Sequence, residues 1–247
     1  MRQQLLLSVF ALITLFNLSC KKSDDATPYV CQTCKKIPDA LAANDAISKG
    51  IYKGVIIGSS GTVMFDILNS GTTITATLVL DGVTTTLTSN VSWTAGAPYI
   101  GSFTGTLSGN PVSISFSVNA NGTSPTVIAY NIPGHPNASF TIVKETSQNL
   151  VECFEGTYNT SKPESGVFNV VLGRSISLWG GATRKLTGGG TQSTTNINGT
   201  ISSDSSLYQT VSNGSIKIGS LYGHEMSGSF VDPSDNSTVT FYGKRSW

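Results

Sequence analysis

Four cysteines and two histidines carry the most specific chemistry in this chain. Cys31 and Cys34 form a CxxC motif, which could be a redox pair or half of a zinc site. Zinc needs four ligands, and the remaining candidates, Cys153, His135 and His224, are far away in the sequence. A redox CxxC belongs at the start of a helix in a βαβ unit, and the sequence has no such pattern. We therefore expect a structural disulfide, either Cys31 with Cys34 or one of them with Cys153.

Histidines and aromatic residues are the candidates for ligand contact. His135 and His224 each follow a glycine, and each could touch a ligand or make a backbone hydrogen bond in a turn. Trp93, Trp179 and Tyr99 could stack on a sugar ring, but large aromatic side chains more often fill a core.

The sequence gives little support for an enzyme. A Gly-x-Ser-x-Gly nucleophile elbow needs a strand-to-helix turn, which the pattern does not provide. The loop Asp232–Asn236 has several oxygen-bearing side chains, yet it lacks the spacing of a calcium loop and resembles an ordinary hairpin turn. Acids that could form a glycosidase pair show no informative spacing: Asp66, Asp81, Glu152, Glu155 and Glu164. We therefore predict no enzymatic activity, no cofactor and no metal.

The charge balance argues against a nucleic-acid partner. Removing residues 1–19 takes away Arg2 and leaves 14 basic and 14 acidic residues. No basic stripe remains to neutralise a phosphate backbone.

Alternation of apolar and polar residues predicts an all-β fold. The clearest example is residues 72–88, where two alternating stretches flank Asp81-Gly82. Asp-Gly favours a two-residue type I′ hairpin turn, which pairs Leu80 with Val83 and fixes every later pair. One face of this hairpin is then mainly apolar, and the other is a ladder of threonines, which strands favour on a solvated side.

The same period recurs along the chain in two units. Residues 51–144 offer about eight short strands with no helical crossover, so neighbouring strands should be antiparallel. A second unit from Cys153 resembles the first at separations of roughly 90–100 residues, which predicts an internal repeat. The paired segments are Tyr52–Gly54 with Phe154–Gly156, Phe103–Leu107 with Ile197–Ile201, and Gly134-His135 with Gly223-His224. Glycine-rich stretches at Gly180-Gly181 and Gly188–Gly190 predict looser middle strands in the second unit.

The N-terminal part predicts export. Arg2 precedes an apolar run from Leu5 to Phe16, which is too short to span a bilayer comfortably, and Leu18-Ser19-Cys20 follows. This ending, with a polar tail and paired acids after it, resembles the lipoprotein signals of the Bacteroidetes. The resemblance implies that Cys20 becomes the acylated first residue, in the bacterial outer membrane and exposed at the cell surface.

The predicted organisation has four parts. Residues 1–19 form a cleaved signal peptide, and 20–49 a lipid-anchored tether whose Pro38–Lys49 stretch favours a short helix. Residues 50–145 and 152–247 form two antiparallel meander modules, each a small barrel or sandwich. Phe65, Phe103 and Phe116 suggest that the first module is filled.

Three functions stay open for such a protein. The first, which we favour, is a non-catalytic binding or structural module for a glycan or another envelope protein. The second is a lipocalin-like carrier of a small apolar ligand, which a ligand-sized void would support. The third is a glycosidase-type enzyme, which requires two carboxyl groups in a cleft.

Overall fold

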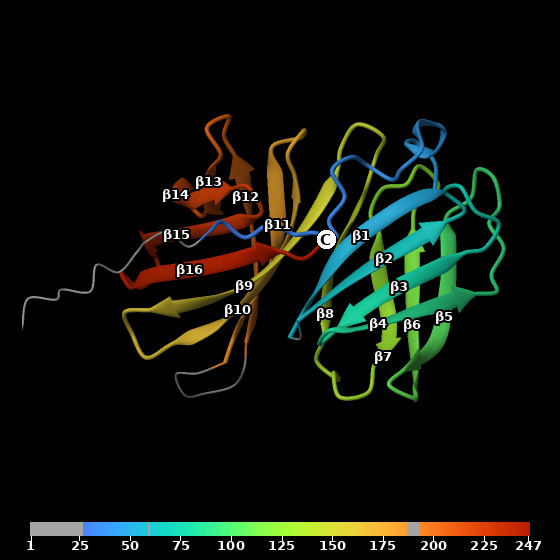
Figure 1. Cartoon of the computed structure of the whole chain (residues 1–247), viewed down its shortest axis with the longest axis horizontal. Coiled ribbons are helices and arrows are strands. Elements are labelled where there is room, and N and C mark those ends of the chain that lie inside the picture. Colours follow the sequence, from blue (N-terminus) through green and yellow to red (C-terminus); the bar gives the residue numbers. More distant parts are fainter. Residues whose placement is uncertain (1–26, 59, 187–192) are drawn as a thin grey trace, which may run out of the picture.

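The computed structural model describes residues 27–58, 60–186 and 193–247, and within them it is built from β-strands around one short 3-10 turn. Eight strands lie between residues 50 and 144 and eight between 151 and 245, so the predicted pair of all-β antiparallel modules is confirmed. The two sheets curl side by side (Figure 1). Within the described residues no helix is long and apolar enough to cross a bilayer.

The first module, called barrel 1 below, is an eight-stranded meander whose first and last strands pair. Its sheet order is β7-β6-β5-β4-β3-β2-β1-β8, with no backbone ladder between β7 and β8 among the described residues. The Tyr130 and Phe140 rings span that seam at 5.3 Å between centroids. The strands are β1 (Gly50–Ile57), β2 (Gly61–Ile67), β3 (Thr75–Leu80), β4 (Val83–Ser89), β5 (Tyr99–Leu107), β6 (Asn110–Val118), β7 (Thr126–Asn131) and β8 (Ser139–Lys144).

The second module, barrel 2, repeats this meander and closes completely. Each strand pairs with its neighbour in the chain, and β9 also pairs with β16, which leaves no free edge. The sequence left barrel and sandwich open, and the closed order selects the barrel. The strands are β9 (Val151–Thr160), β10 (Ser165–Gly173), β11 (Leu178–Lys185), β12 (Thr194–Ile201), β13 (Ser206–Val211), β14 (Gly214–Tyr222), β15 (Glu225–Val231) and β16 (Thr238–Arg245).

The Asp81-Gly82 hairpin has the predicted register. Leu80 pairs with Val83, Ala76 with Leu87 and Thr75 with Thr88. Asp81 and Gly82 have φ values of 48° and 79°, as a type I′ turn requires. The turn residues Asp81 and Gly82 therefore determine the register between β3 and β4.

The predicted helix at Pro38–Lys49 is wrong. The structure has only a three-residue 3-10 turn there, η1 (Ala42–Asn44). The ammonium of Lys144 binds the carbonyls of Asn44 at 2.7 Å and Lys49 at 2.9 Å, and it also contacts the carbonyl of Ile47. These carbonyls bind the half-buried ammonium of Lys144 on β8 and not the amides of a following helical turn, so this tertiary contact overrides helix propensity.

The two modules have the same strand connectivity, as the predicted repeat requires, but only one of the three paired segments lies at equivalent positions. Tyr52–Gly54 and Phe154–Gly156 lie on the first strand of each barrel. Phe103–Leu107, however, lies on the fifth strand of barrel 1, whereas Ile197–Ile201 lies on the fourth strand of barrel 2. His135 and His224 also lie in different turns, before the last strand of barrel 1 and before the seventh strand of barrel 2. Those two matches reflect common Gly, Ser and Thr residues, not equivalent positions.

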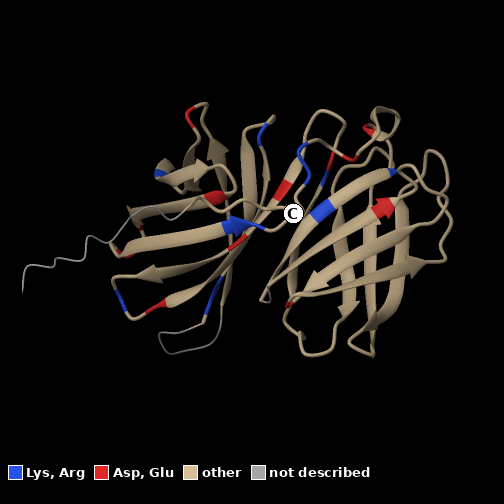
Figure 2. Ribbon diagram, viewed as in Figure 1, with Lys and Arg blue, Asp and Glu red and all other residues tan. Residues whose placement is uncertain are grey.

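Aromatic rings fill barrel 1, as predicted. Phe65 stacks on Phe116 with centroids 4.3 Å apart and meets Phe103 edge-on at 5.0 Å. Tyr52 also packs on Phe116, with ring centroids 5.3 Å apart. From Leu68 to Val143 the only Asp, Glu, Lys or Arg is Asp81, so this barrel carries little charge on its β3–β7 side (Figure 2).

The two barrels pack wall to wall through β1 and β8 of barrel 1 and β9–β11 of barrel 2. Every residue of β1 is buried because one face serves the core of barrel 1 and the other faces barrel 2. The apolar part of this junction consists of Val55, Ile57, Val143, Val151, Cys153, Val171, Ala182 and Trp247. Asn169 on β10 donates to the carbonyl of Ile56 on β1 at 2.6 Å.

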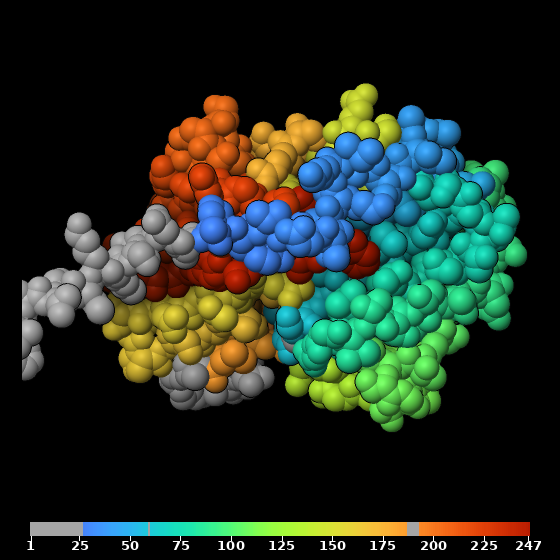
Figure 3. Space-filling view, in the orientation of Figure 1, coloured from blue at the N-terminus to red at the C-terminus, as the bar shows by residue number. Residues whose placement is uncertain are grey.

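Residues 27–49, the N-terminal segment, cross both barrels. In Figure 3 this blue segment begins over barrel 2 and runs across the junction to barrel 1. Residues 1–26, including the predicted signal peptide and Cys20, lie outside the described residues, as do Gly188–Gly190.

Candidate functional site

The interior of barrel 2 is lined by aromatic rings that lie against glycines. Phe168 pairs across the sheet with Gly156, and Gly156 pairs with Gly243. A Cβ atom at either glycine would lie within 2.6 Å of the Phe168 ring. Two further rings repeat the arrangement, Phe241 opposite Gly228 and Trp179 opposite Gly199. Because the rings spread over bare backbone, the middle of the barrel stays open.

The space that remains is a cavity of about 390 Å³. This lies within the range of about 300–1,000 Å³ that small-molecule sites in proteins have. The apolar part of its lining consists of Phe168, Val170, Trp179, Ile197, Leu207, Ile218, Met226, Phe230, Val239 and Phe241. Barrel 1 has its own rings packed against one another, so the cavity distinguishes two barrels of the same topology.

Charged side chains surround the mouth of the cavity, from the β9–β10 and β15–β16 connections and the end of β11. Lys185 binds Glu164 at 2.7 Å, and Lys162 binds Asp235 at 2.7 Å. Tyr158 donates its hydroxyl to the other oxygen of Glu164 at 3.2 Å. Burial, and next the negative charge of Glu164, raise the pKa of Tyr158 to about 12, so this hydroxyl keeps its proton at neutral pH.

A buried ion cluster closes the opposite end of barrel 2. Glu152 shares the inward face of β9 with Phe154, and Arg245 on β16 pairs opposite Phe154. Arg245 binds one oxygen of Glu152 at 2.7 Å, and Arg174 binds the other at 2.5 Å. Both Glu152 oxygens are therefore bound by guanidinium groups, with Glu152 and Arg245 buried and Arg174 half-exposed.

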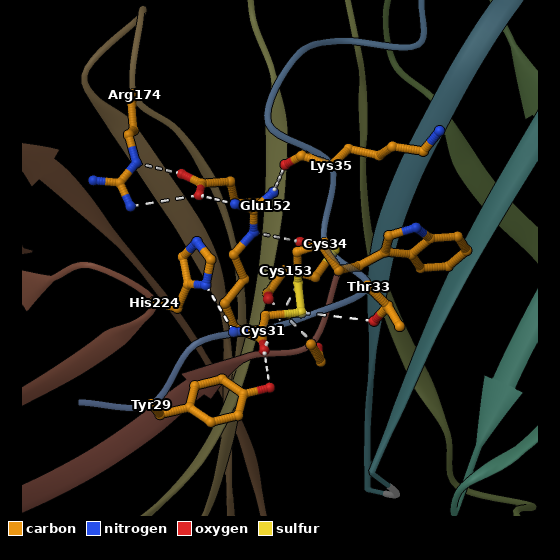
Figure 4. The surroundings of a disulfide bond; sticks show 12 residues. Tyr29, Cys31, Thr33, Cys34, Lys35, Glu152, Cys153, Arg174 and His224 are labelled. Carbon is orange, nitrogen blue, oxygen red and sulfur yellow. Dashed lines mark hydrogen bonds and ion pairs between the residues drawn. A yellow bond between two sulfur atoms is a disulfide. The ribbon is translucent and has the colours of Figure 1, made fainter. Parts of the chain in front are cut away.

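The N-terminal segment packs over this closed end, around the disulfide that Cys31 forms with Cys34 (Figure 4). Arg245 donates to the carbonyl of Lys35 at 2.6 Å, and Tyr29 donates to the carbonyl of Arg245 at 3.0 Å. The amide of Cys31 donates to Nδ1 of His224 at 2.8 Å. Burial, and next the positive charge of Arg245, lower the pKa of His224, which keeps Nδ1 available as an acceptor.

Cys153 is the free thiol of the described chain, and it lies in the junction. Its sulfur faces the carbonyl of Gly54 at 3.7 Å, and burial raises its pKa to about 12. We predict that, in a Cys20→Ser chain, iodoacetamide labels no thiol of the native protein and labels one thiol in urea, because only the exposed thiolate reacts. Mass spectrometry of the labelled chain measures this, and rapid labelling of the native protein would show that the junction is open.

The structure separates the remaining candidates from one another. Trp179 contributes to the cavity wall and donates its indole N–H to the carbonyls of Thr200 and Tyr208, both at 3.2 Å. Trp93 lies on barrel 1, bound to the hydroxyl of Ser48 at 2.8 Å. His135 lies 3.3 Å from Asp81, whereas His224 accepts from the amide of Cys31, so the two histidines share no site.

The acids considered for catalysis do not converge either. Asp66 caps the amide of Asn69, Asp81 meets His135, Glu152 closes barrel 2, Glu155 accepts from Ser60 in the junction, and Glu164 lies at the rim. Asp232 binds the amide and hydroxyl of Ser234, which is the turn geometry expected from the sequence. Among the described residues, no group of three metal-binding side chains could hold a metal ion.

The cavity residues Phe168, Phe230 and Phe241 were not singled out as a site from the sequence. Phe168 lies against Gly156 and Gly243, which are 12 and 75 residues away, and the register that brings them together was unknown. No protein-family model, curated protein or solved structure matches this chain. The function must therefore be inferred from the cavity itself.

Proposed function

We propose that this protein binds a small, largely apolar molecule inside barrel 2, as a carrier or receptor. The observation that supports this proposal is the cavity of about 390 Å³ beside a filled barrel of the same topology. An empty apolar interior forfeits packing contacts, so a protein that keeps one gives up stability for the space. Of the functions considered from the sequence, the lipocalin-like carrier fits this observation better than a flat glycan-binding surface or a glycosidase.

The test is a fluorescence titration with N-phenylnaphthylamine, an uncharged dye that brightens in apolar sites. The full chain should carry Cys20→Ser, so that no acyl chain competes for the cavity. Thr183 on β11 lines the cavity, and Thr183→Trp places a large ring in it. We expect this variant to bind the dye at least tenfold more weakly, because the ring occupies the ligand's volume.

The matched control is Thr86→Trp, which puts the same ring on the exposed face of barrel 1. It should bind the dye as the parent does, and circular dichroism should show both variants folded. Absence of dye binding to the parent, or equal binding by the Thr183→Trp variant, would refute the cavity as the site.

We also propose that Cys20 carries acyl chains that anchor the protein to the bacterial outer membrane, at the cell surface. The lipoprotein-like ending at Cys20 supports this proposal. Six residues lie between Cys20 and Thr27, and a chain of that length spans at most about 25 Å. Because the described chain begins over barrel 2 (Figure 3), the barrel with the cavity would then lie close to the lipid surface.

Replacing Cys20 by serine tests the anchor. The variant should leave the detergent phase for the aqueous phase in a Triton X-114 partition, because stable anchoring depends on buried acyl chains. A double variant, Cys31→Ser with Cys34→Ser, removes two other cysteines and should stay in the detergent phase. Retention of the Cys20→Ser variant in detergent would contradict the assignment, and digestion by protease added to intact cells would report surface exposure.

A further inference from the structure

The lining of the barrel 2 cavity changes from apolar to polar along the barrel axis. Deep in the barrel, Trp179, Leu207 and Met226 belong to the buried apolar cluster. Nearer the mouth, Thr183, Thr195 and Gln209 replace apolar side chains on the inward faces. The rim then carries the charged residues Lys162, Glu164, Lys185, Asp232 and Asp235. A molecule that fills this space therefore has an apolar end inside and a polar end at the mouth.

The rim charges are already engaged with one another. Lys185 pairs with Glu164, whose second oxygen accepts from Tyr158. Lys162 binds both the carboxylate of Asp235, at 2.7 Å, and its backbone carbonyl, at 2.8 Å. Two lysines face three carboxylates, so the rim has no surplus of positive charge.

These ion pairs determine which kind of polar end, or head group, of a ligand the rim accepts. An anionic head group would have to take a lysine from its carboxylate and would meet the remaining acids, and desolvating an unpaired charge is costly. A cationic head group would in turn compete with a lysine for Glu164 or Asp235. An uncharged hydroxyl head group needs neither exchange, because the hydroxyls of Thr183 and Thr195 and the amide of Gln209 can donate to it and accept from it.

We infer that the ligand of barrel 2 is an uncharged amphiphile, with an apolar body against the aromatic wall and a hydroxyl-type head group below the charged rim. This inference rests on the proposed function, since it names the class of ligand for the same cavity. The paired rim lysines act in specificity: they keep carboxylate-bearing amphiphiles out while the head group is recognised by the threonine and glutamine side chains.

The test compares dodecanol, dodecanoate and dodecylamine as competitors of bound N-phenylnaphthylamine, below the concentrations at which they form micelles. The protein is the full Cys20→Ser chain. Dodecanol should displace the dye at a concentration at least tenfold lower than either charged analogue. Glu164→Gln frees Lys185 from its partner, so it should improve competition by dodecanoate at least tenfold and leave dodecanol nearly unchanged. Glu225→Gln removes the same charge from a carboxylate outside the cavity lining and should change neither.

The outcomes distinguish the head-group inference from the proposed binding function. If the dye binds and dodecanoate competes as well as dodecanol, or if the Glu164→Gln and Glu225→Gln variants behave alike, the head-group inference is overturned while the cavity remains a binding site. If the dye does not bind to the parent chain, the proposed function itself fails. A tenfold preference for dodecanol that Glu164→Gln shifts toward dodecanoate supports both.

Discussion

Replacing Lys53 by methionine is expected to lower the free energy of unfolding by about 3–5 kcal/mol, because it strands a buried carboxylate. Lys53 and Glu145 are 1% and 0% exposed, and their charged atoms lie 2.7 Å apart in the junction. Glu145 also accepts from the amides of Asp39 at 2.7 Å and Val151 at 3.0 Å. One carboxylate thus joins the N-terminal segment, barrel 1 and the start of barrel 2. Urea unfolding followed by circular dichroism measures the loss.

Two further variants show whether the loss of stability comes from the burial of the ion pair or from ion pairing alone. Lys162→Met breaks a pair of the same length, but its partners are 52% and 43% exposed, so the cost should stay within about 1 kcal/mol. Adding Glu145→Gln to Lys53→Met removes the stranded charge and should recover part of the loss. A cost for Lys53→Met no larger than that of Lys162→Met would mean that water reaches the junction.

Phe116→Ala should lower the free energy of unfolding by about 3–5 kcal/mol, because it opens a void among packed rings. Phe116 is fully buried and contacts both Phe65 and Tyr52. Phe230→Ala removes the same atoms from the wall of barrel 2, where the freed space joins an existing cavity, and should cost only about 1–2 kcal/mol. Urea unfolding of the two variants gives the comparison.

The same two variants should rank in the opposite order for dye binding: Phe230→Ala should change the affinity, and Phe116→Ala should not. Phe116→Ala should leave N-phenylnaphthylamine binding unchanged, since the ring belongs to barrel 1. Phe230→Ala changes the cavity wall and should alter the affinity. Equal stability losses in the two barrels would argue that barrel 2 is as tightly packed as barrel 1, and the proposed site would lose its basis.

Local patterns in the sequence were sufficient to predict those parts of the fold that depend on short-range interactions. The Asp81-Gly82 turn set the register of β3 and β4, because two residues with positive φ leave one way to pair the flanking strands. The alternation of apolar side chains gave the number of strands in barrel 1 and the inward direction of Phe65, Phe103 and Phe116. The absence of a helical crossover gave the antiparallel meander.

Where the structure differs from the predictions made from the sequence, the cause is an interaction between residues that are far apart in the chain. The expected helix at Pro38–Lys49 failed because Lys144, about 100 residues away, binds the carbonyls that a helix would use. The lysine within the apolar strand Gly50–Ile57 was visible in the sequence, but its partner Glu145 was not, since nothing local selects it. The pairing of Cys31 with Cys34 was one of the alternatives considered, and only the structure excludes Cys153, which it buries in the junction.

The sequence by itself determined the all-β class, the two modules, the antiparallel order and which side chains point inward, because these follow from turn chemistry and the period of a strand. The phenylalanines of barrel 1 predicted that it is filled, and only the tertiary structure decided that barrel 2 is hollow. In barrel 1 rings meet rings, whereas in barrel 2 rings such as Phe168 meet glycines such as Gly156 on the neighbouring strand. That difference depends on the register between strands that are far apart in the sequence, such as β9 and β16, which no local pattern fixes.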